Sequence, residues 1–388
     1  MQFWIISFFL AFKEIWRNRS RFLSVSMVIA LITVLVLFIA ALGEGLGNGN
    51  REYLAKLDAH LLVYQEQSDF LIAGSRLSRS TLNAVRRVDG VEAAGLIATS
   101  NATLILPQGE ELRVSMLGVE AGSPAEPPVE QGVQLSTDLA SEVILDQQAA
   151  LRSGVQVGDE LTLRVNQAAR DEYYTLRVVG ISDGRQYSLQ PVIFVPYFTW
   201  DRVRPKSEAE MIRADLNMNV VAVRLSDPTQ IDQVKQRLEE EVEDVAVADI
   251  ATAIQNVPGY SAQQSTIQTQ GVFTLLIGVL VIGGFFQIQI LQKVAQIGVL
   301  KAIGAPNFLV GLAAVIQIVM ITTIGVAVGG LGVFLLSLGF PPTIPIVFNG
   351  QATVLAIAAL LLIGPIGGLV SIRYAVRIEP LRALGLGG

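Results

Sequence analysis

Four stretches of the sequence are apolar, contain no charged residue and are long enough to cross a lipid bilayer as helices. They are residues 22–42, 272–291, 308–328 and 352–370. A helix needs about 20 residues to cross the hydrocarbon core. Because none of these stretches contains Asp, Glu, Lys, Arg or His, we expect four transmembrane helices. The remainder of the 388 residues then includes a sizeable part in water.

Basic residues lie next to these stretches on one side only. They are Lys13, Arg17, Arg19 and Arg21 before the first stretch, Lys293 and Lys301 in the link 292–307, and Arg373, Arg377 and Arg382 in the tail 371–388. The loop 329–351, on the other side, contains none. Because basic residues mark the cytoplasmic face, we expect both termini inside the cell and residues 43–271 outside it.

The first apolar stretch has a second interpretation, as a cleaved signal peptide. The small residues Ala40, Ala41 and Gly43 offer a cleavage site, but the apolar run exceeds the about 7–15 residues of a signal-peptide core. We therefore expect a retained helix. Residues 1–21, which are aromatic and apolar up to Trp16, predict an interfacial helix on the inner leaflet.

The composition excludes several classes of active site. The chain has no cysteine, so disulfides, cysteine-ligated zinc and a thiol nucleophile are ruled out. His60 is the only histidine and is interpreted as structural, and the sequence lacks the Gly-Lys dipeptide of a phosphate-binding P-loop. The net charge of −6 argues against a nucleic-acid partner. We expect no catalytic residue, no metal and no cofactor in this chain.

The outer segment 43–271 holds all the acidic residues except Glu14 and Glu379, and its pattern is mixed α/β. We predict strands at 61–64, 91–106, 143–145, 161–165, 174–181, 192–195, 220–225 and 245–248, and helices at 78–88, 147–152 and 228–241. Asp146 is the expected N-cap of the helix 147–152, and Gly154 its stop. We expect two subdomains, one near the membrane (about 43–105 and 205–262) and a distal insertion (about 106–204).

The polar residues within the apolar stretches are all uncharged. They include Gln287 and Gln289 in the second stretch, and Gln317, Thr322 and Thr323 in the third. Ion-coupled carriers place ionisable groups near the bilayer centre, so the pattern does not favour a carrier. We interpret these residues as interhelical hydrogen-bonding groups. The glycines at 278, 283, 284, 325, 329, 330, 332, 364, 367 and 368 predict close helix contacts.

The link 292–307 is the most distinctive short segment. It predicts an amphipathic helix with Ile297, Leu300 and Ile303 on one side and Gln296 and Lys301 on the other, which ends at Gly304. An exposed helix of this kind suits docking into the groove of a partner protein. A purely structural turn between two transmembrane helices is the alternative.

Residues 297–305 read Ile-Gly-Val-Leu-Lys-Ala-Ile-Gly-Ala, which resembles the signature of the bacterial permease family that includes MacB, the Lol permeases and FtsX. The segment 11–21 resembles the family's entry into its first helix. Residues 143–163, 177–181 and 194–196 resemble its periplasmic core, and residues 377–384 resemble its tail. The likeness covers about 10–385. Family members often have an acidic residue at the positions of Gln296 and, in the third helix, near Gln317.

The resemblance implies a type VII ABC transporter permease in the bacterial inner membrane. Its fold would have four transmembrane helices with an extended stalk and a large α/β domain in the periplasm or extracellular space. The implied function is mechanotransmission: ATP hydrolysis in a separate ATPase subunit would drive export of an amphiphilic, lipid-linked or drug-like substrate. The alternative is a signal transmitter that activates an outer enzyme.

The resemblance also implies the partners of the chain. They are two copies of the ATPase, which would bind the ATP and Mg, a second permease copy or a paralogue, and membrane lipid. A membrane-fusion adaptor protein is a further option that depends on whether an outer membrane exists. Gln296, Ile297, Leu300, Lys301, Ile303 and Gly304 would form the ATPase-coupling contact.

Overall fold

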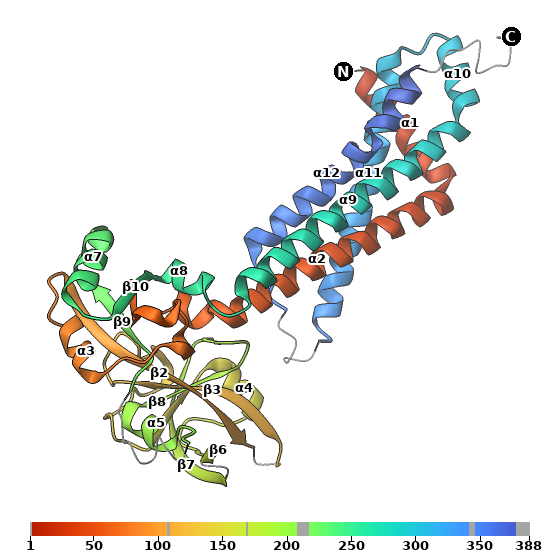
Figure 1. Ribbon diagram of the computed structural model, residues 1–388. Coiled ribbons are helices and arrows are strands. Elements are labelled where there is room, and N and C mark those ends of the chain that lie inside the picture. Colours follow the sequence, from red (N-terminus) through yellow and green to blue (C-terminus); the bar gives the residue numbers. More distant parts are fainter. Residues whose placement is uncertain (1, 107–108, 168–169, 208–216, 341–345, 378–388) are drawn as a thin grey trace. The chain divides into compact units, whose positions relative to one another are not determined.

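The computed structural model describes residues 2–106, 109–167, 170–207, 217–340 and 346–377 of the chain, which divides into two compact units (Figure 1). The helical unit comprises Met1–Gly45 and Gln264–Gly388, and the α/β unit comprises Leu46–Gln263. The predicted outer loop 329–351 and tail 371–388 lie partly outside the described residues, at 341–345 and 378–388.

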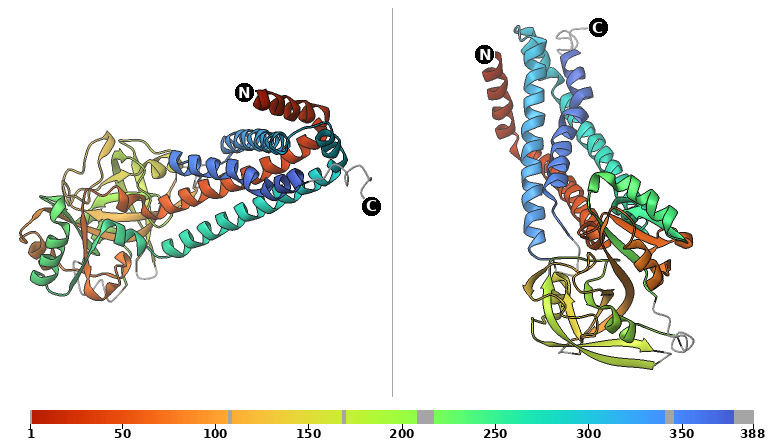
Figure 2. Two further views of the ribbon diagram at one scale, coloured as in Figure 1. Left: turned by 90° about the horizontal axis from the view of Figure 1, so that it is seen from above. Right: turned by 90° about the vertical axis from the view of Figure 1, so that its left-hand side faces the viewer.

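The helical unit is a bundle in which four helices contain the predicted transmembrane stretches. Its helices are α1 (Gln2–Arg17), α2 (Arg19–Ala55, which continues into the α/β unit), α9 (Tyr260–Gln292), α10 (Val294–Ala302), α11 (Asn307–Ser337) and α12 (Gly350–Arg377). By length and composition, α2, α9, α11 and α12 can cross a membrane. These helices lie alongside one another in the bundle (Figure 2) and share one hydrophobic core. Each contributes buried side chains to this core, such as Ile29, Phe286, Ile321 and Ile363.

Glycines let the helices of the bundle approach each other at the level of the backbone. A Cβ atom at Gly283 of α9 would stand 2.7 Å from the carbonyl oxygen of Gly367 of α12. A Cβ atom at Gly329 of α11 would stand 2.6 Å from the carbonyl oxygen of Ala30 of α2. The adjacent Gly284 has no such neighbour within 4 Å. Small residues at these contacts allow the close packing that membrane helices use in place of the hydrophobic effect.

The two neighbouring glycines of α9 provide a matched test of this packing. Gly283→Ala should lower the free energy of unfolding of the detergent-purified protein by about 1–3 kcal/mol, because the added methyl group must push α12 away. Gly284→Ala should leave stability unchanged or raise it, since Ala favours helix more than Gly does. Thermal unfolding followed by circular dichroism measures both. Equal effects of the two substitutions would show that the α9–α12 contact is looser than described.

Polar groups inside the bundle have different surroundings. The hydroxyl of Ser371 in α12 donates to Oε1 of Gln287 in α9 at 3.3 Å, which confirms the predicted interhelical hydrogen bond for this glutamine. The amide nitrogens of Gln289 and Gln317 and the hydroxyl of Thr322 are buried without a hydrogen-bond partner among the described residues. For these three, the predicted interhelical hydrogen bond is absent from the described part of the chain.

The α/β unit is built around one mixed sheet. Its strands are β1 (Leu61–Gln65), β2 (Val91–Ile105), β3 (Glu111–Val119), β4 (Val129–Gly132), β5 (Glu142–Leu145), β6 (Glu160–Gln167), β7 (Arg170–Ser182), β8 (Val192–Pro196), β9 (Val220–Leu225) and β10 (Val245–Asp249). The order is β10-β1-β9-β2-β3-β8-β5-β7-β4, and β6 pairs with β2 and β7. The β3–β8 and β5–β7 pairs are parallel, and the other pairs are antiparallel.

The central strands of this sheet are buried on both faces. In β1, Leu61 and Val63 belong to one hydrophobic cluster, and Leu62 and Tyr64 belong to the other. Successive side chains of a strand point to opposite faces, so a run of apolar residues requires cover on both sides. The first face is covered by α3 (Arg79–Val85), α4 (Gln147–Ser153), α5 (Tyr197–Val203) and α7 (Ile231–Glu241). The second face is covered by α8 (Ile250–Gln255) and the last turns of α2.

The end of α2 is part of the core of the α/β unit. Tyr53 and Leu54 are fully buried on the second face of the sheet. The guanidinium of Arg185, itself buried, donates to the carbonyl of Lys56 at 2.7 Å, just beyond the last residue of α2. A cation at this position complements the negative end of the helix dipole. The helix is therefore fixed at its C-terminal end by packing and by charge.

The predicted division at about 106 and 204 does not separate two cores. Each hydrophobic cluster contains residues from both predicted subdomains: Val63 and Val143 share one, and Leu62 and Ile144 share the other. The long strand β2 ends at Ile105, beside the proposed boundary, and pairs with β9 of the predicted membrane-proximal part and with β3 and β6 of the predicted distal part. The sheet is continuous because these pairings link segments that are far apart in the sequence.

The predicted cap of α4 is present and carries a buried carboxylate. Asp146 accepts a hydrogen bond from the backbone N–H of Ala149 at 2.5 Å, and Gly154 ends the helix at φ 67°. The second carboxylate oxygen of Asp146 is buried without a partner among the described residues. Burial raises the pKa of Asp146 to about 7, against the opposing effect of the backbone hydrogen bonds.

This raised pKa predicts a pH dependence of stability. Below about pH 4 Asp146 is protonated in both the folded and the unfolded chain; between pH 4 and about 7 the folded chain holds the proton more tightly, so stability falls as the pH rises. Asp146→Asn keeps a capping oxygen and removes the titration. Urea unfolding of residues 46–263 measures the free energy of unfolding at pH 5 and at pH 8. The decrease between these pH values should be smaller in the variant than in the wild type, by on the order of 2 kcal/mol.

Asp249, the N-cap of α8, provides the control for this measurement. Its side chain accepts from the backbone N–H of Thr252 at 2.7 Å, and hydrogen bonds with Thr252 lower its pKa. It is therefore ionised throughout the window from pH 5 to pH 8. Asp249→Asn should leave the loss of stability across this window as in the wild type. If Asp146→Asn behaved in the same way, Asp146 would not be the titrating group.

Candidate functional site

The link between α9 and α11 folds into the short helix α10, which ends at a tight glycine turn. The helix spans Val294–Ala302, and Gly304 follows it at φ 100°. The N–H of Gly304 donates to the carbonyl of Lys301 at 3.0 Å, and that of Ala305 donates to the carbonyl of Leu300 at 3.1 Å. This pair of bonds is the Schellman motif, which favours glycine because the left-handed conformation strains other residues. Gly304 thus fixes where α10 ends and how the chain enters α11.

One face of α10 packs against the bundle. Val294, Ile297 and Leu300 contact a small cluster formed by Ile290 of α9, Val310 of α11 and Ala375 of α12. Gly298, on the same side, is buried. With 100° between successive residues of a helix, these positions form one continuous stripe. The stripe holds α10 onto the ends of three long helices.

The opposite face of α10 is exposed and largely apolar. It consists of Ala295, Gln296, Val299, Ala302 and Ile303. Val299 is 49% exposed and Ile303 is 78% exposed. An exposed apolar face of this kind marks a surface for interaction with a protein or with lipid.

Lys301 joins α10 to the end of α12. Its Nζ donates to the carbonyl of Val376 at 2.6 Å, in the last turn of α12. The last carbonyls of a helix lack intrahelical partners and form the negative end of its dipole, so a cation there is stabilising. Burial lowers the pKa of Lys301. The side chain of Lys301 is thus engaged within the bundle.

A second basic residue fastens α1 to the start of α10. Lys293 forms an ion pair with Glu14 of α1, and its Nζ lies 5.5 Å from the ring centroid of Phe22. Burial lowers the pKa of Lys293, while Glu14 acts in the opposite direction. With Lys301, this residue ties α10 to two neighbouring helices at one end of the bundle.

The structure therefore distributes the six predicted coupling residues over different parts of α10. Gln296, Ile303 and Gly304 lie on the exposed side, whereas Ile297 and Leu300 face the bundle and Lys301 is bonded to α12. The amphipathic pattern assumed from the sequence grouped Ile297 and Leu300 with Ile303. Val299, which that pattern omitted, lies beside Ile303 at the i, i+4 spacing and could have been found only by considering both apolar faces.

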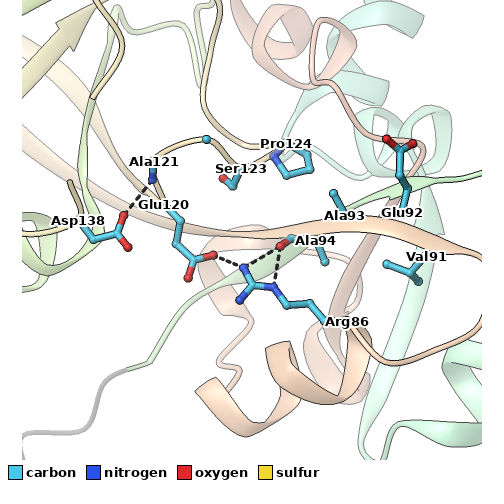
Figure 3. A pocket seen from close by; sticks show the side chains of 11 residues that line it. Arg86, Val91, Glu92, Ala93, Ala94, Glu120, Ala121, Ser123, Pro124 and Asp138 are labelled. Atoms are coloured by element: carbon cyan, nitrogen blue, oxygen red, sulfur yellow. Dashed lines mark hydrogen bonds and ion pairs between the residues drawn. The ribbon is translucent and has the colours of Figure 1, made fainter. Parts of the chain in front are cut away.

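The α/β unit contains a concavity of about 430 Å³ near Arg86 (Figure 3). The guanidinium of Arg86 donates to the carbonyl of Ala94 at 3.0 and 2.8 Å and to Oε2 of Glu120 at 2.5 Å. Asp138 accepts from the N–H of Ala121 at 2.9 Å, and Glu92 pairs with Arg224 at 3.1 Å. The charged groups of this concavity are thus satisfied by the protein itself, which favours a structural role.

The surroundings of His60 and of the acidic side chains favour structural roles. His60 accepts a hydrogen bond at Nδ1 from the N–H of Leu225 at 3.1 Å, consistent with a structural role between β1 and β9. Within the described ranges, no group of three or more His, Asp and Glu side chains could hold a metal ion. The exposed face of α10 therefore remains the strongest candidate for function.

Relatives among known proteins match nearly the whole chain. It is 24% identical over 381 residues to the putative hemin transport system permease protein HrtB of Staphylococcus haemolyticus, covering 97% of this chain and 99% of the relative. It is 26% identical over 389 residues to an uncharacterized ABC transporter permease of Mycobacterium tuberculosis, with the same coverage. The crystal structure of the extracellular domain of the transporter YknZ aligns with a TM-score of 0.35 at 14% identity, over 49% of this chain and 99% of that domain.

Two protein-family models match consecutive parts of the chain. Residues 25–241 match the MacB-like periplasmic core domain, and residues 270–380 match the FtsX-like permease C-terminal domain. The first match alone covers more than half of the 388 residues. Together with the four membrane-spanning helices, these matches confirm the predicted type VII permease fold and an inner-membrane protein with an extracytoplasmic α/β domain. The chain belongs to the MacB/FtsX family of ABC transporter permeases.

Proposed function

We propose that the chain is the permease subunit of an exporter and that the exposed face of α10 is the docking surface for a separate ATPase. The observation that carries this proposal is the pair Val299 and Ile303, exposed on a helix whose other face is fixed to three long helices. A rigidly held helix with an apolar outer face suits insertion into a partner's groove. A displacement of α10 by the ATPase would then be transmitted directly to α9, α11 and α12.

The proposed docking surface requires α10 to face the cytoplasm. Arg17, Lys293, Lys301 and Arg373 belong to the basic residues that flank the membrane-spanning helices near α10. The positive-inside rule places such residues in the cytoplasm, and ATP hydrolysis takes place there. In the assembly we propose, two ATPase subunits act on two permeases, which are identical or paralogous.

Placing a charge on the exposed face should uncouple the two subunits. Ile303→Asp should reduce the ATPase activity of the reconstituted complex, and the amount of ATPase that co-purifies, by about tenfold or more, because the carboxylate would be desolvated in an apolar groove. Val299→Asp should have the same effect. ATP turnover in proteoliposomes and co-purification with a tagged permease measure these changes.

The control for this test is an equivalent change at an exposed apolar residue elsewhere. Leu151 in α4 of the α/β unit is 65% exposed, and Leu151→Asp should leave ATPase binding and turnover unchanged. Leu300→Asp differs again: it would place a charge against the bundle and destabilise α10 itself. Wild-type turnover in the Ile303→Asp complex would disprove the proposed contact.

We further propose that the exported cargo is an amphiphile of the hemin type. The support is that relatives named as hemin transport permeases match 97% of this chain. In addition, the apolar stretches 22–42, 272–291, 308–328 and 352–370 of the four membrane-spanning helices carry no charged residue that would line a path for a hydrophilic solute. A large apolar molecule with a few carboxylates can instead be taken from the bilayer and moved outward by the extracytoplasmic domain.

This cargo assignment predicts a specific stimulation. Hemin added to proteoliposomes containing the permease and its ATPase should raise ATP turnover several-fold, and loss of the permease gene should make cells more sensitive to hemin. A macrolide, as a drug-like amphiphile, serves as the comparison. Stimulation by the macrolide but not by hemin would reassign the cargo. ATP turnover that depended only on an outer enzyme would favour the signal-transmitter alternative.

A further inference from the structure

A cavity of about 440 Å³ lies within the helical unit, at the end of the bundle that carries α1 and α10. It is lined by α1, the last turns of α9, α10, the first turns of α11 and Ala375 of α12. One part of its wall is apolar and includes Phe286, Ile290 and Ile318. The other part is polar and contains amides and basic side chains. A cavity with this division can hold a molecule that has both a polar and an apolar end.

Two buried amides face this cavity from different helices. Gln289 of α9 is 2% exposed and Gln317 of α11 is 7% exposed. Both line the cavity, and the Nε2 group of each is buried without a hydrogen-bond partner among the described residues. A buried donor without an acceptor costs free energy, more so in a region of low dielectric. Two such donors that converge on one cavity indicate that a hydrogen-bond acceptor belongs there.

The charge around the cavity indicates that the acceptor is an anion. Lys13, Arg17 and Lys293 line it, and Glu14, the one acidic residue of the described wall, is paired with Lys293. Lys13 and Arg17 have exposed side chains on α1. The wall therefore carries an excess of positive charge, which attracts anions. A phosphate group can accept from the amides and from the basic side chains together.

The exposed aromatic and basic side chains of α1 indicate that this cavity lies at the level of lipid headgroups. Lys13, Glu14 and Arg17 of α1 line the cavity, and Lys13 and Arg17 are one helical turn apart. The exposed aromatic side chains of α1 are Phe8, Phe9, Phe12 and Trp16. At 100° per residue Phe8 and Phe12 fall opposite the cavity side, whereas Phe9 lies on the side of Lys13, whose Nζ is 5.6 Å from the centroid of the Phe9 ring. Aromatic residues of this kind sit at the membrane–water interface. The cavity lies behind a helix that is itself at the interface.

We propose that this cavity binds the phosphate headgroup of an anionic glycerophospholipid. The amides of Gln289 and Gln317 donate to the phosphate oxygens, Lys13 and Arg17 neutralise its charge, and an acyl chain lies along the apolar wall. Gln296, Ile297 and Leu300 of α10 also line the cavity, so the lipid contacts the helix that links α9 to α11. The binding itself does not depend on α10 docking an ATPase, and either proposal can fail without the other.

The test uses the detergent-purified full-length chain and native mass spectrometry, with titrations of phosphatidylglycerol, phosphatidylcholine and inorganic phosphate. Phosphatidylglycerol should bind about tenfold more tightly than phosphatidylcholine, and inorganic phosphate should not displace it at millimolar concentration. Gln289→Leu combined with Gln317→Leu should weaken phosphatidylglycerol binding about tenfold. These substitutions replace unpartnered amides with apolar groups of similar size, so the fold should persist.

A neighbouring glutamine provides the matched control. Gln287 of α9 is not among the residues that line the cavity, and its Oε1 accepts from Ser371 at 3.3 Å. Gln287→Leu should leave lipid binding unchanged. If the double amide variant did not fold, Lys13→Gln with Arg17→Gln, at two exposed positions, should still weaken binding severalfold.

Three results would overturn the proposal. Equal binding of phosphatidylcholine and phosphatidylglycerol would remove the role of anionic charge. Displacement of the lipid by millimolar inorganic phosphate would make this a site for the free anion. Wild-type affinity for phosphatidylglycerol in a folded Gln289→Leu, Gln317→Leu variant would show that the lipid binds elsewhere.

Discussion

The absence of charged side chains from the apolar stretches of the four membrane-spanning helices (22–42, 272–291, 308–328 and 352–370) is the constraint on which the rest of the helical unit depends. Helices that bury no ion pair in the bilayer must associate through backbone proximity, as at Gly283 and Gly367, and through uncharged groups such as Gln287 and Ser371. Charge is confined to the ends of the helices. At one end it is used structurally: Lys293 pairs with Glu14, and Lys301 binds the last turn of α12.

The sequence predicted the elements of the α/β unit better than their assembly. Strands such as β1 and β9 are short apolar runs that could be placed from composition, and Asp146 and Gly154 marked α4 because caps are local features. The strand β3 was not predicted, and its neighbours in the sheet are β2 and β8, from either side of the proposed subdomain boundary. Boundaries placed at about 106 and 204 from the sequence could not foresee pairings between distant segments, which carry no local signal.

At the candidate site, the sequence located α10 and its end but could not orient it. Both faces of this helix are apolar, with Ile297 and Leu300 on one and Val299 and Ile303 on the other, so periodicity alone does not distinguish them. What decides between the faces is contact with Ile290, Val310 and Ala375, residues from three other helices. The same limit applies to Gln289 and Gln317, since whether an intramembrane amide finds a partner depends on the rotation of its helix.

The two surfaces of α10 connect the membrane interior with the proposed site of the ATPase. Ile297 and Leu300 line the cavity and also hold the helix in place, while Gln296 reaches both the cavity wall and the exposed side. Because α10 has only nine residues and ends at Gly304, it has little room to bend, and a displacement of one face must move the other. A lipid in the cavity would therefore resist inward movement of α10. Lipid binding and ATPase docking, which rest on different residues, would then be mechanically coupled through α10.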